Sequence, residues 1–258
     1  MKDTLRQISV ALSIAVMILV NVLANTIPIN GQNTGEISDR FRIYFVPAGY
    51  VFSIWGVIYI GLIALAVFQA LPSQRENPRM RSTGWWIVFG SLANITWIFL
   101  WHYEQFPWTL IAMLVLLTTL IVTYLRLGTG KTAVTKVETW TVRVPISIYM
   151  GWITVATVAN VTQLLYFLNW DGFGIAPEAW MWIVLATVFV ITALMNFSRR
   201  DIAYTVVILW ALAGISIKHA DVPAVAIPTW ITFGLVTLTL LMAYLLPWKK
   251  TPVYPVHN

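Results

Sequence analysis

Aromatic and amide side chains recur at helical spacing in three strongly apolar stretches, and these are the residues that could do chemistry. They are, stretch by stretch, Phe52, Trp55 and Tyr59; Asn94, Trp97 and Trp101; and Tyr149, Trp152, Asn160 and Gln163. Their spacings place each set on one face of a helix. Flat π surfaces beside a few amide and phenol groups are typical of a cavity for a flat, apolar, polyunsaturated or aromatic ligand.

A structural role explains the same spacing. Tryptophan usually lies at the membrane boundary, but Trp55, Trp97 and Trp152 fall inside their apolar stretches. Amide side chains in hydrocarbon must face protein or a cavity, because lipid offers no partners. They can therefore also lock helices together, at about 0.6–2 kcal/mol for each interhelical hydrogen bond. Spacing alone leaves both interpretations open.

The composition excludes several classes of protein. Of the 258 residues, 59% are hydrophobic and 10% are charged, whereas an ordinary soluble domain is about 25% charged. A soluble enzyme and a disordered chain are therefore excluded. With no Cys and three His, we predict no metal site, no covalent cofactor and no catalytic residues. The net charge of +6 is interpreted as membrane topology, not as nucleic-acid binding.

Eight apolar stretches approach the length of a membrane-spanning helix, about 20 residues. They run near Ile8–Ile27, Ala48–Leu71, Gly84–Tyr103, Trp108–Leu127, Val142–Leu168, Ala179–Phe197, Ile202–Ile217 and Val225–Leu246, and the seventh is short. The predicted fold is an all-α integral membrane protein, a polytopic bundle of about eight transmembrane helices. No charged residue lies at membrane depth in these stretches, which argues against a pump or an ion-coupled carrier.

The basic residues predict the orientation. If the N-terminus is cytoplasmic, all but three of the 16 Lys and Arg residues lie on the cytoplasmic side, Lys249 and Lys250 included. The exceptions are Arg40, Arg42 and Lys218. Because positive charge concentrates in cytoplasmic loops, we predict a multi-pass protein of the cell (inner) membrane with both termini in the cytoplasm.

Three motifs resemble those of a known family. The stretch Trp152–Asn160 reads W-I-T-V-A-T-V-A-N and is similar to the fifth-helix motif of the TspO/MBR family, the tryptophan-rich sensory or translocator proteins. Tyr149 stands three residues before Trp152, where the family has a tyrosine. Asn94 and Trp97 match the family's N-x-x-W on the third helix.

The second helix carries the third motif. Pro47, Phe52, Trp55 and Tyr59 are similar to the family's P-x-W-V-F-G-P-V-W-x-x-x-Y, one residue shorter here. In the family, the loop between helices one and two lids the ligand cavity. Its W-Y-x-x-L-x-K-P motif is absent from the corresponding loop of this chain, residues 31–46.

The resemblance covers about Ile8 to Asn169, which corresponds to five helices. We therefore predict a TspO-like five-helix core in residues 1–170 and a three-helix extension in residues 171–258. Few interior polar groups lie in the extension, so we expect it to pack beside the core as a buttress or partner surface and not to form the ligand site.

The resemblance implies a sensory or receptor-like membrane protein that binds a tetrapyrrole such as protoporphyrin IX or haem, or a sterol, at the aromatic and amide positions named above. Alternatives are a transporter of a small hydrophobic or neutral solute and a pigment-holding subunit of a larger membrane complex. An enzyme would need an acid or base at depth, where Tyr59 and Tyr149 are the candidates; a photochemical activity stays open. Membrane lipid, a hydrophobic small molecule and a second copy or larger complex are the expected partners.

Overall fold

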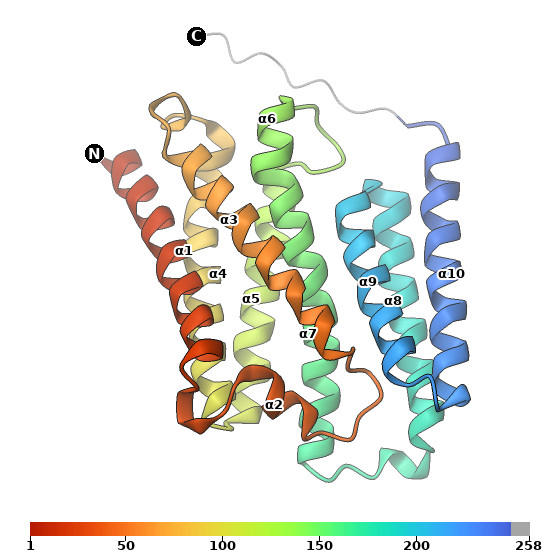
Figure 1. Ribbon diagram of the computed structural model, residues 1–258. Helices are drawn as coiled ribbons and strands as arrows, with labels where there is room; N and C mark the ends of the chain where they lie inside the picture. The colour runs from red at the N-terminus through yellow and green to blue at the C-terminus, as the bar shows by residue number, and fades with distance from the viewer. Residues whose placement is uncertain (249–258) are drawn as a thin grey trace.

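The computed structural model describes residues 1–248 and forms one bundle of long helices (Figure 1). The last ten residues of the predicted extension, Lys249 and Lys250 among them, lie outside the described residues. The helices are α1 (Lys2–Thr26), α2 (Thr34–Asp39), α3 (Ile54–Ala70), α4 (Pro78–His102), α5 (Phe106–Arg126), α6 (Lys136–Glu138), α7 (Val144–Phe167), α8 (Pro177–Arg199), α9 (Ile202–Lys218) and α10 (Pro223–Leu245). Short 3₁₀ segments are η1 (Ile29–Gly31), η2 (Gly49–Ser53), η3 (Pro72–Gln74) and η5 (Gly172–Gly174), and η4 (Thr139–Arg143) is π-helical.

Five helices form a closed ring that corresponds to the predicted core. Around the ring, α1 contacts α4, α4 contacts α5, α5 contacts α7, α7 contacts α3, and α3 returns to α1. Helices α4 and α5 of the ring carry proline in their first turn, at Pro78 and Pro107, where the missing N–H costs nothing. The interior of this ring is where the candidate site lies.

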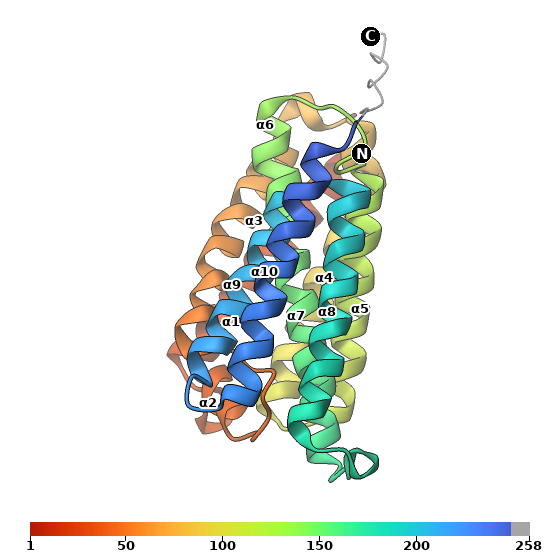
Figure 2. The same cartoon turned by 90° about the vertical axis from the view of Figure 1, so that its right-hand side faces the viewer.

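The three remaining long helices form a second layer beside the ring. Helices α8, α9 and α10 contact one another, and α9 contacts α7. Figure 2, seen from this side, shows α10 in front with α8 beside it and α9 between α10 and the ring. The approach is close at Gly151 of α7, because a Cβ there would lie 3.0 Å from the carbonyl oxygen of Tyr204 on α9. Glycine therefore permits this packing.

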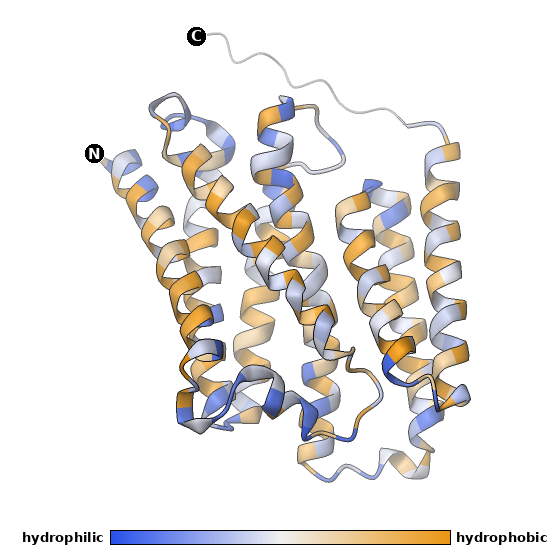
Figure 3. Ribbon diagram, in the orientation of Figure 1, coloured by the Kyte–Doolittle hydropathy of each residue, from blue (hydrophilic) through white to orange (hydrophobic). Residues whose placement is uncertain are grey.

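The hydropathy of the bundle matches a membrane protein. Within residues 1–248, seven helical segments are long and apolar enough to cross a membrane, and α9, with 17 residues, is a shorter apolar helix. Apolar residues dominate the helices and hydrophilic ones gather toward the two ends (Figure 3). Large apolar side chains such as Leu12, Ile60 and Leu194 are exposed on the outside, where lipid would cover them. The all-α polytopic membrane fold is thus confirmed.

The second predicted span differs in detail from the structure. Residues Gly49–Ser53 form η2, a 3₁₀ turn, and the α-helix begins only at Ile54. The Val51 carbonyl accepts a hydrogen bond from the Trp210 indole of α9 at 3.1 Å, and the Ala48 N–H donates to the Gly214 carbonyl at 3.2 Å. These contacts with α9 hold the segment in its tighter conformation, which apolar periodicity could not foresee.

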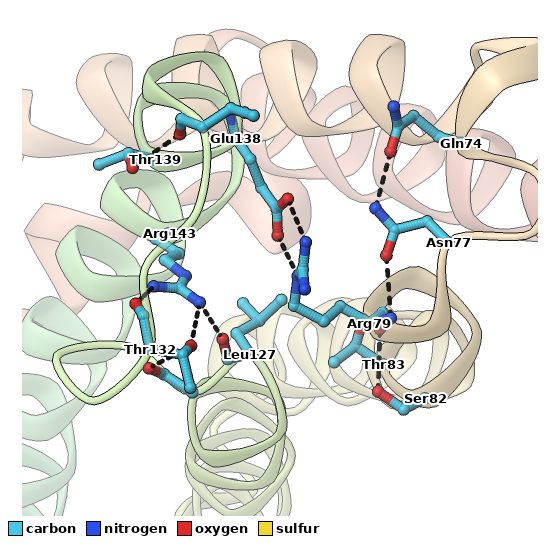
Figure 4. A network of polar contacts seen from close by, with 12 residues as sticks. Gln74, Asn77, Arg79, Ser82, Thr83, Leu127, Thr132, Glu138, Thr139 and Arg143 are labelled. Atoms are coloured by element: carbon cyan, nitrogen blue, oxygen red, sulfur yellow. Dashed lines mark hydrogen bonds and ion pairs between the residues drawn. The ribbon is translucent and has the colours of Figure 1, made fainter. Parts of the chain in front are cut away.

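Charged side chains join elements at the end of the bundle where α1 begins. Arg79 of α4 donates from Nη2 to Glu138 of α6 at 2.7 Å, and Asn77 caps α4 by accepting from the Arg79 N–H (Figure 4). Glu138 is buried, with 3% of its surface exposed. A buried carboxylate needs such a partner, so this pair ties the α6 segment to the core.

Candidate functional site

A small cavity lies inside the five-helix ring, close to the end opposite the start of α1. Its volume is ≈ 60 Å³. Most of its wall is aromatic or aliphatic, and every side chain that lines it belongs to the stretch between Thr34 and Gln163. Helices α8 to α10 contribute none of the lining residues.

The structure brings eight of the ten predicted site residues to this cavity. They are Phe52, Trp55, Asn94, Trp97, Trp101, Trp152, Asn160 and Gln163. The other two lie behind the wall. Tyr59 stacks on Trp55 with ring centroids 5.6 Å apart, and Tyr149 contacts the edge of Trp55 at 6.0 Å. A direct role for any of the ten in ligand binding stays a prediction.

The aromatic wall is built from two packed sets of rings. On one side, Trp97 and Trp101 stack at 5.2 Å with an angle of 18° between their planes. On the other, the Trp152 ring meets the edge of Phe52 at 5.6 Å and that of Trp55 at 6.3 Å. These geometries are those aromatic pairs prefer, and they leave ring faces and edges directed at the cavity.

A chain of polar side chains supports one wall at mid-bundle. The Asn21 amide of α1 donates to Asn94 Oδ1 of α4 at 2.6 Å, and the Asn94 amide donates to the Tyr149 hydroxyl of α7 at 2.9 Å. All three residues are buried. Asn94 therefore joins α1, α4 and α7 through hydrogen bonds and also lines the cavity.

Three polar atoms at the cavity have no hydrogen-bond partner in the described part of the chain. They are the Nε1 atoms of Trp97 and Trp152 and the Oδ1 atom of Asn160. The Asn160 amide nitrogen, by contrast, donates to Thr109 Oγ1 at 3.2 Å. Buried polar groups are nearly always satisfied, so two donors and one acceptor around an aromatic cavity are typical of a binding site.

The segment between α1 and α3 covers the cavity at the end of the bundle opposite the start of α1. We call residues 32–46 of this segment the lid. Thr34 and Ser38 of the lid line the cavity. The Trp101 indole donates to the Thr34 carbonyl at 3.2 Å, and the Gln163 amide donates to Ser38 Oγ at 3.3 Å. The lid of this chain is thus held by neutral contacts from α4 and α7.

Ion pairs fasten the outer rim of the lid. Arg40 donates to Glu104 at 2.9 Å, and Lys218 at the end of α9 donates to Asp39 at 3.0 Å. The Arg40 guanidinium lowers the pKa of the Glu104 carboxyl below its ordinary value. Both pairs are substantially exposed, so each is a weak latch.

Sequence reasoning did not identify several lining residues. Met113 and Leu116 of α5 complete the wall, and Thr34 and Ser38 come from the lid. Ala156 also lines the cavity, on the helical face that spacing assigns to Trp152 and Asn160. Spacing could not identify the α5 residues, because that helix carries no distinguishing polar pattern.

The fold and this cavity define a class: a polytopic helical membrane protein with an aromatic-lined cavity inside a ring of five helices. The chain belongs to the TSPO-like protein family, whose model matches residues 7–242. This match extends beyond Asn169 into α10 and so includes most of the extension. No curated protein and no solved structure matches the chain. Family membership identifies the chain as a membrane protein of a sensory, ligand-binding family.

Proposed function

We propose that the protein is a receptor-like membrane protein whose five-helix core binds a flat hydrophobic ligand, with a tetrapyrrole as the first candidate. The observation that carries this proposal is the set of three unpartnered polar atoms, on Trp97, Trp152 and Asn160, inside an aromatic wall. Flat rings can stack on the indoles, while the two N–H donors and one acceptor suit polar groups at the ligand's edge.

Protoporphyrin IX fits the lining better than haem does. No histidine of the described part of the chain lines the cavity. His102 lies close by, but its Nε2 bonds the Thr34 hydroxyl at 3.1 Å and its Nδ1 bonds the Ile29 carbonyl at 3.1 Å. Met113 is the one lining residue of a type that serves as an axial haem ligand. A metal-free macrocycle such as protoporphyrin IX needs no axial ligand.

The proposal requires the lid to move. A volume of ≈ 60 Å³ holds about one or two water molecules, whereas sites for drug-sized ligands are about 300–1,000 Å³. The lid and η2 are the parts that can open, because they line the cavity without belonging to the long helices. Binding should therefore be slow relative to diffusion and should depend on the contacts that hold the lid.

Fluorescence titration of the purified full-length protein with protoporphyrin IX tests this proposal. A porphyrin next to indole should quench tryptophan emission. Stacking on an aromatic side chain is worth roughly 1–3 kcal/mol, so Trp152→Phe, which keeps a smaller ring but removes the N–H, should weaken binding by roughly tenfold. The matched control is Trp182→Phe, because Trp182 is exposed on α8 outside the cavity lining.

Two outcomes would reject the tetrapyrrole. One is the absence of saturable quenching; the other is equal affinity for both variants and the wild type. Either would favour the interpretation that the tryptophans and amides lock the helices, or that the core binds a different hydrophobic molecule.

We further propose that both termini face the cytoplasm of a cell (inner) membrane. Supporting this, α1 begins and α10 ends at the same end of the bundle (Figure 1). That end carries most of the basic residues, Arg79, Arg143 and Arg200 among them. Reporter fusions at Ser73 and Gly172 should locate to opposite sides, with Ser73 cytoplasmic; a cytoplasmic signal from Gly172 would overturn this orientation.

A further inference from the structure

A second, much larger space lies between the five-helix ring and the extension. This groove has a volume of ≈ 990 Å³ and runs between α3, η4 and α7 on one side and α9 on the other. Its two parts differ in chemistry. The basic mouth is formed by Arg143, Arg199 and Arg200, and the apolar channel is lined by residues that include Val57, Ile148, Val206, Val207 and Trp210.

Arg143 is a buried cation without a carboxylate. Only 6% of its surface is exposed. Its guanidinium donates to the Leu127 carbonyl and to Thr132 Oγ1, both at 2.6 Å, and its Nε has no partner in the described residues. Glu138 is nearby, but Figure 4 shows its carboxylate directed at Arg79. Among the described residues, the hydrogen bonds of the Arg143 guanidinium therefore go to neutral oxygens alone.

Arg199 and Arg200 are half-buried, and neither has a carboxylate partner within the described residues. Arg199 donates to the Thr129 carbonyl at 3.3 Å, and Arg200 donates to the Leu246 carbonyl at 2.6 Å. The Arg200 guanidinium also lies over the Trp248 ring, 4.6 Å from its centroid, and its Nε is buried without a partner in the described residues.

The nearest acid does not neutralise the basic mouth. Within residues 1–248, no carboxylate oxygen lies within 4.0 Å of a guanidinium nitrogen of Arg143, Arg199 or Arg200. Asp201 also lines the groove, but its Oδ2 accepts from the Ser147 hydroxyl at 2.6 Å and its Oδ1 accepts from the Tyr204 N–H at 3.1 Å. Guanidinium groups at low solvation need an anion, and they match phosphate oxygens well.

We propose that this groove binds one anionic phospholipid, with its phosphodiester at the basic mouth and an acyl chain along the apolar channel. The turn between α8 and α9, which carries Arg200 and Asp201, ends short of α6 on one side and of the end of α10 on the other, so it lies in a recess (Figure 1). A headgroup phosphate at the membrane boundary can reach this recess. Basic pockets between membrane helices are typical sites for anionic lipid headgroups.

The apolar channel favours a lipid over a free phosphate. Val57 of α3 and Val206 of α9 both line the channel, and about half of each side chain is exposed, 51% and 52% respectively. The groove therefore opens sideways toward the membrane and continues from the arginines into apolar surface. A soluble anion would use only the basic mouth, whereas a phospholipid matches both parts.

Native mass spectrometry of the delipidated full-length protein tests the proposal. Phosphatidylglycerol and phosphatidylcholine with identical acyl chains are offered in competition. We expect one phosphatidylglycerol to be retained in preference. An arginine near the membrane surface contributes about fivefold in affinity for an anionic lipid, so Arg199→Gln with Arg200→Gln should lower this preference by about thirtyfold. Arg42→Gln, which removes a charge at the opposite end, should not change it.

A second variant keeps all the charges. Val206→Trp fills the apolar channel and should reduce retention of phosphatidylglycerol while leaving the melting temperature of the helices close to that of the wild type. If the double arginine variant does not fold, Val206→Trp still tests whether the groove binds the phospholipid. Equal retention of the two lipids by the wild type would overturn the proposal. Displacement of bound phosphatidylglycerol by millimolar inorganic phosphate would also overturn it, since the site would then be one for free anions.

Discussion

The cavity inside the five-helix ring and the groove beside it differ in how they handle polarity. The cavity, of ≈ 60 Å³, has neutral lining residues, and its polar atoms without a partner in the described residues belong to Trp97, Trp152 and Asn160. The groove, of ≈ 990 Å³, gathers three guanidinium groups at one end of the bundle. A charge costs most at membrane depth and least near the boundary, where phosphate and water can reach it. The cavity inside the ring therefore has a neutral lining, whereas the groove beside it has a charged one.

Helix α9 lines the groove and also contacts the segment that forms part of the cavity wall. Trp210 of α9 lines the groove, and its indole N–H donates to the carbonyl of Val51 in η2. Further along α9, the Gly214 carbonyl accepts from the Ala48 N–H. The segment that these contacts hold also supplies Pro47 and Phe52 to the cavity wall. The extension therefore contacts this segment without lining the cavity, and its role as a buttress stays a prediction.

Among the variants that test the relation between the cavity and the extension, Gly214→Ala should have the largest effect on stability and on porphyrin affinity. A Cβ at this position would collide with Val51 Cγ2 and lie 3.2 Å from Pro47 Cβ. Val51 has no exposed surface, so η2 must shift, at a cost of about 1–3 kcal/mol. We expect a lower melting temperature and at least a tenfold loss of porphyrin affinity, measured by thermal unfolding in detergent and by quenching of tryptophan fluorescence.

Gly234→Ala is the matched control for this change. Nothing in the described structure lies within 4 Å of a Cβ at Gly234 of α10, and alanine is the better helix former by about 1 kcal/mol. The control should be as stable as the wild type or more so. Equal porphyrin affinity in the two variants would show that the core does not depend on the extension.

The second-largest effect should come from a substitution inside the five-helix ring, Asn94→Leu, and should leave the groove unchanged. Asn94→Leu removes the hydrogen bonds to Asn21 and Tyr149 that join α1, α4 and α7. At about 0.6–1.7 kcal/mol for each interhelical bond, we expect a loss of roughly 1–3 kcal/mol of stability in thermal unfolding. Retention of phosphatidylglycerol in the groove should stay unchanged, because Asn94 contributes nothing to the groove.

Asn25→Leu controls for the loss of an amide. Asn25 is exposed on α1, and its amide bonds only the Asn21 carbonyl of its own helix. A melting temperature as low for Asn25→Leu as for Asn94→Leu would mean that the interhelical chain of hydrogen bonds does not stabilise the ring.

The sequence predicted the helices and one wall of the cavity better than it predicted the groove. Local periodicity suffices for a face such as that of Trp152 and Asn160, because both lie on one helix. Arg143 and Arg200 were interpreted only as topology signals, since nothing local shows that two residues 57 positions apart in the chain line one space. Gly214 carried no signal either, because its close neighbour Val51 lies on a distant segment.

The smallest expected effect concerns access to the cavity. The Arg40–Glu104 pair on the rim of the lid is exposed at 47% and 40% of its two side chains, so it contributes at most about 1 kcal/mol. Arg40→Gln should therefore raise the association rate of protoporphyrin IX by no more than about fivefold, measured by stopped-flow quenching. Arg42→Gln is the control, because Arg42 lies on the same segment and makes no ion pair within residues 1–248.

The pH dependence of the same rate distinguishes the latch from a general loosening of the protein. The folded pKa of Glu104 is lowered by its hydrogen bond from Arg40, so the latch is present above the ordinary glutamate pKa and is lost as the pH falls through the lowered value. The wild-type rate should be the same at pH 7 and pH 5.5 and should rise toward that of Arg40→Gln only in stronger acid. At neutral pH, high salt should reduce the difference in association rate between the wild type and Arg40→Gln, because it screens exposed charges. If Arg40→Gln and Arg42→Gln bind at the same rate under all these conditions, the latch does not govern entry, and the neutral contacts at Thr34 and Ser38 must hold the lid instead.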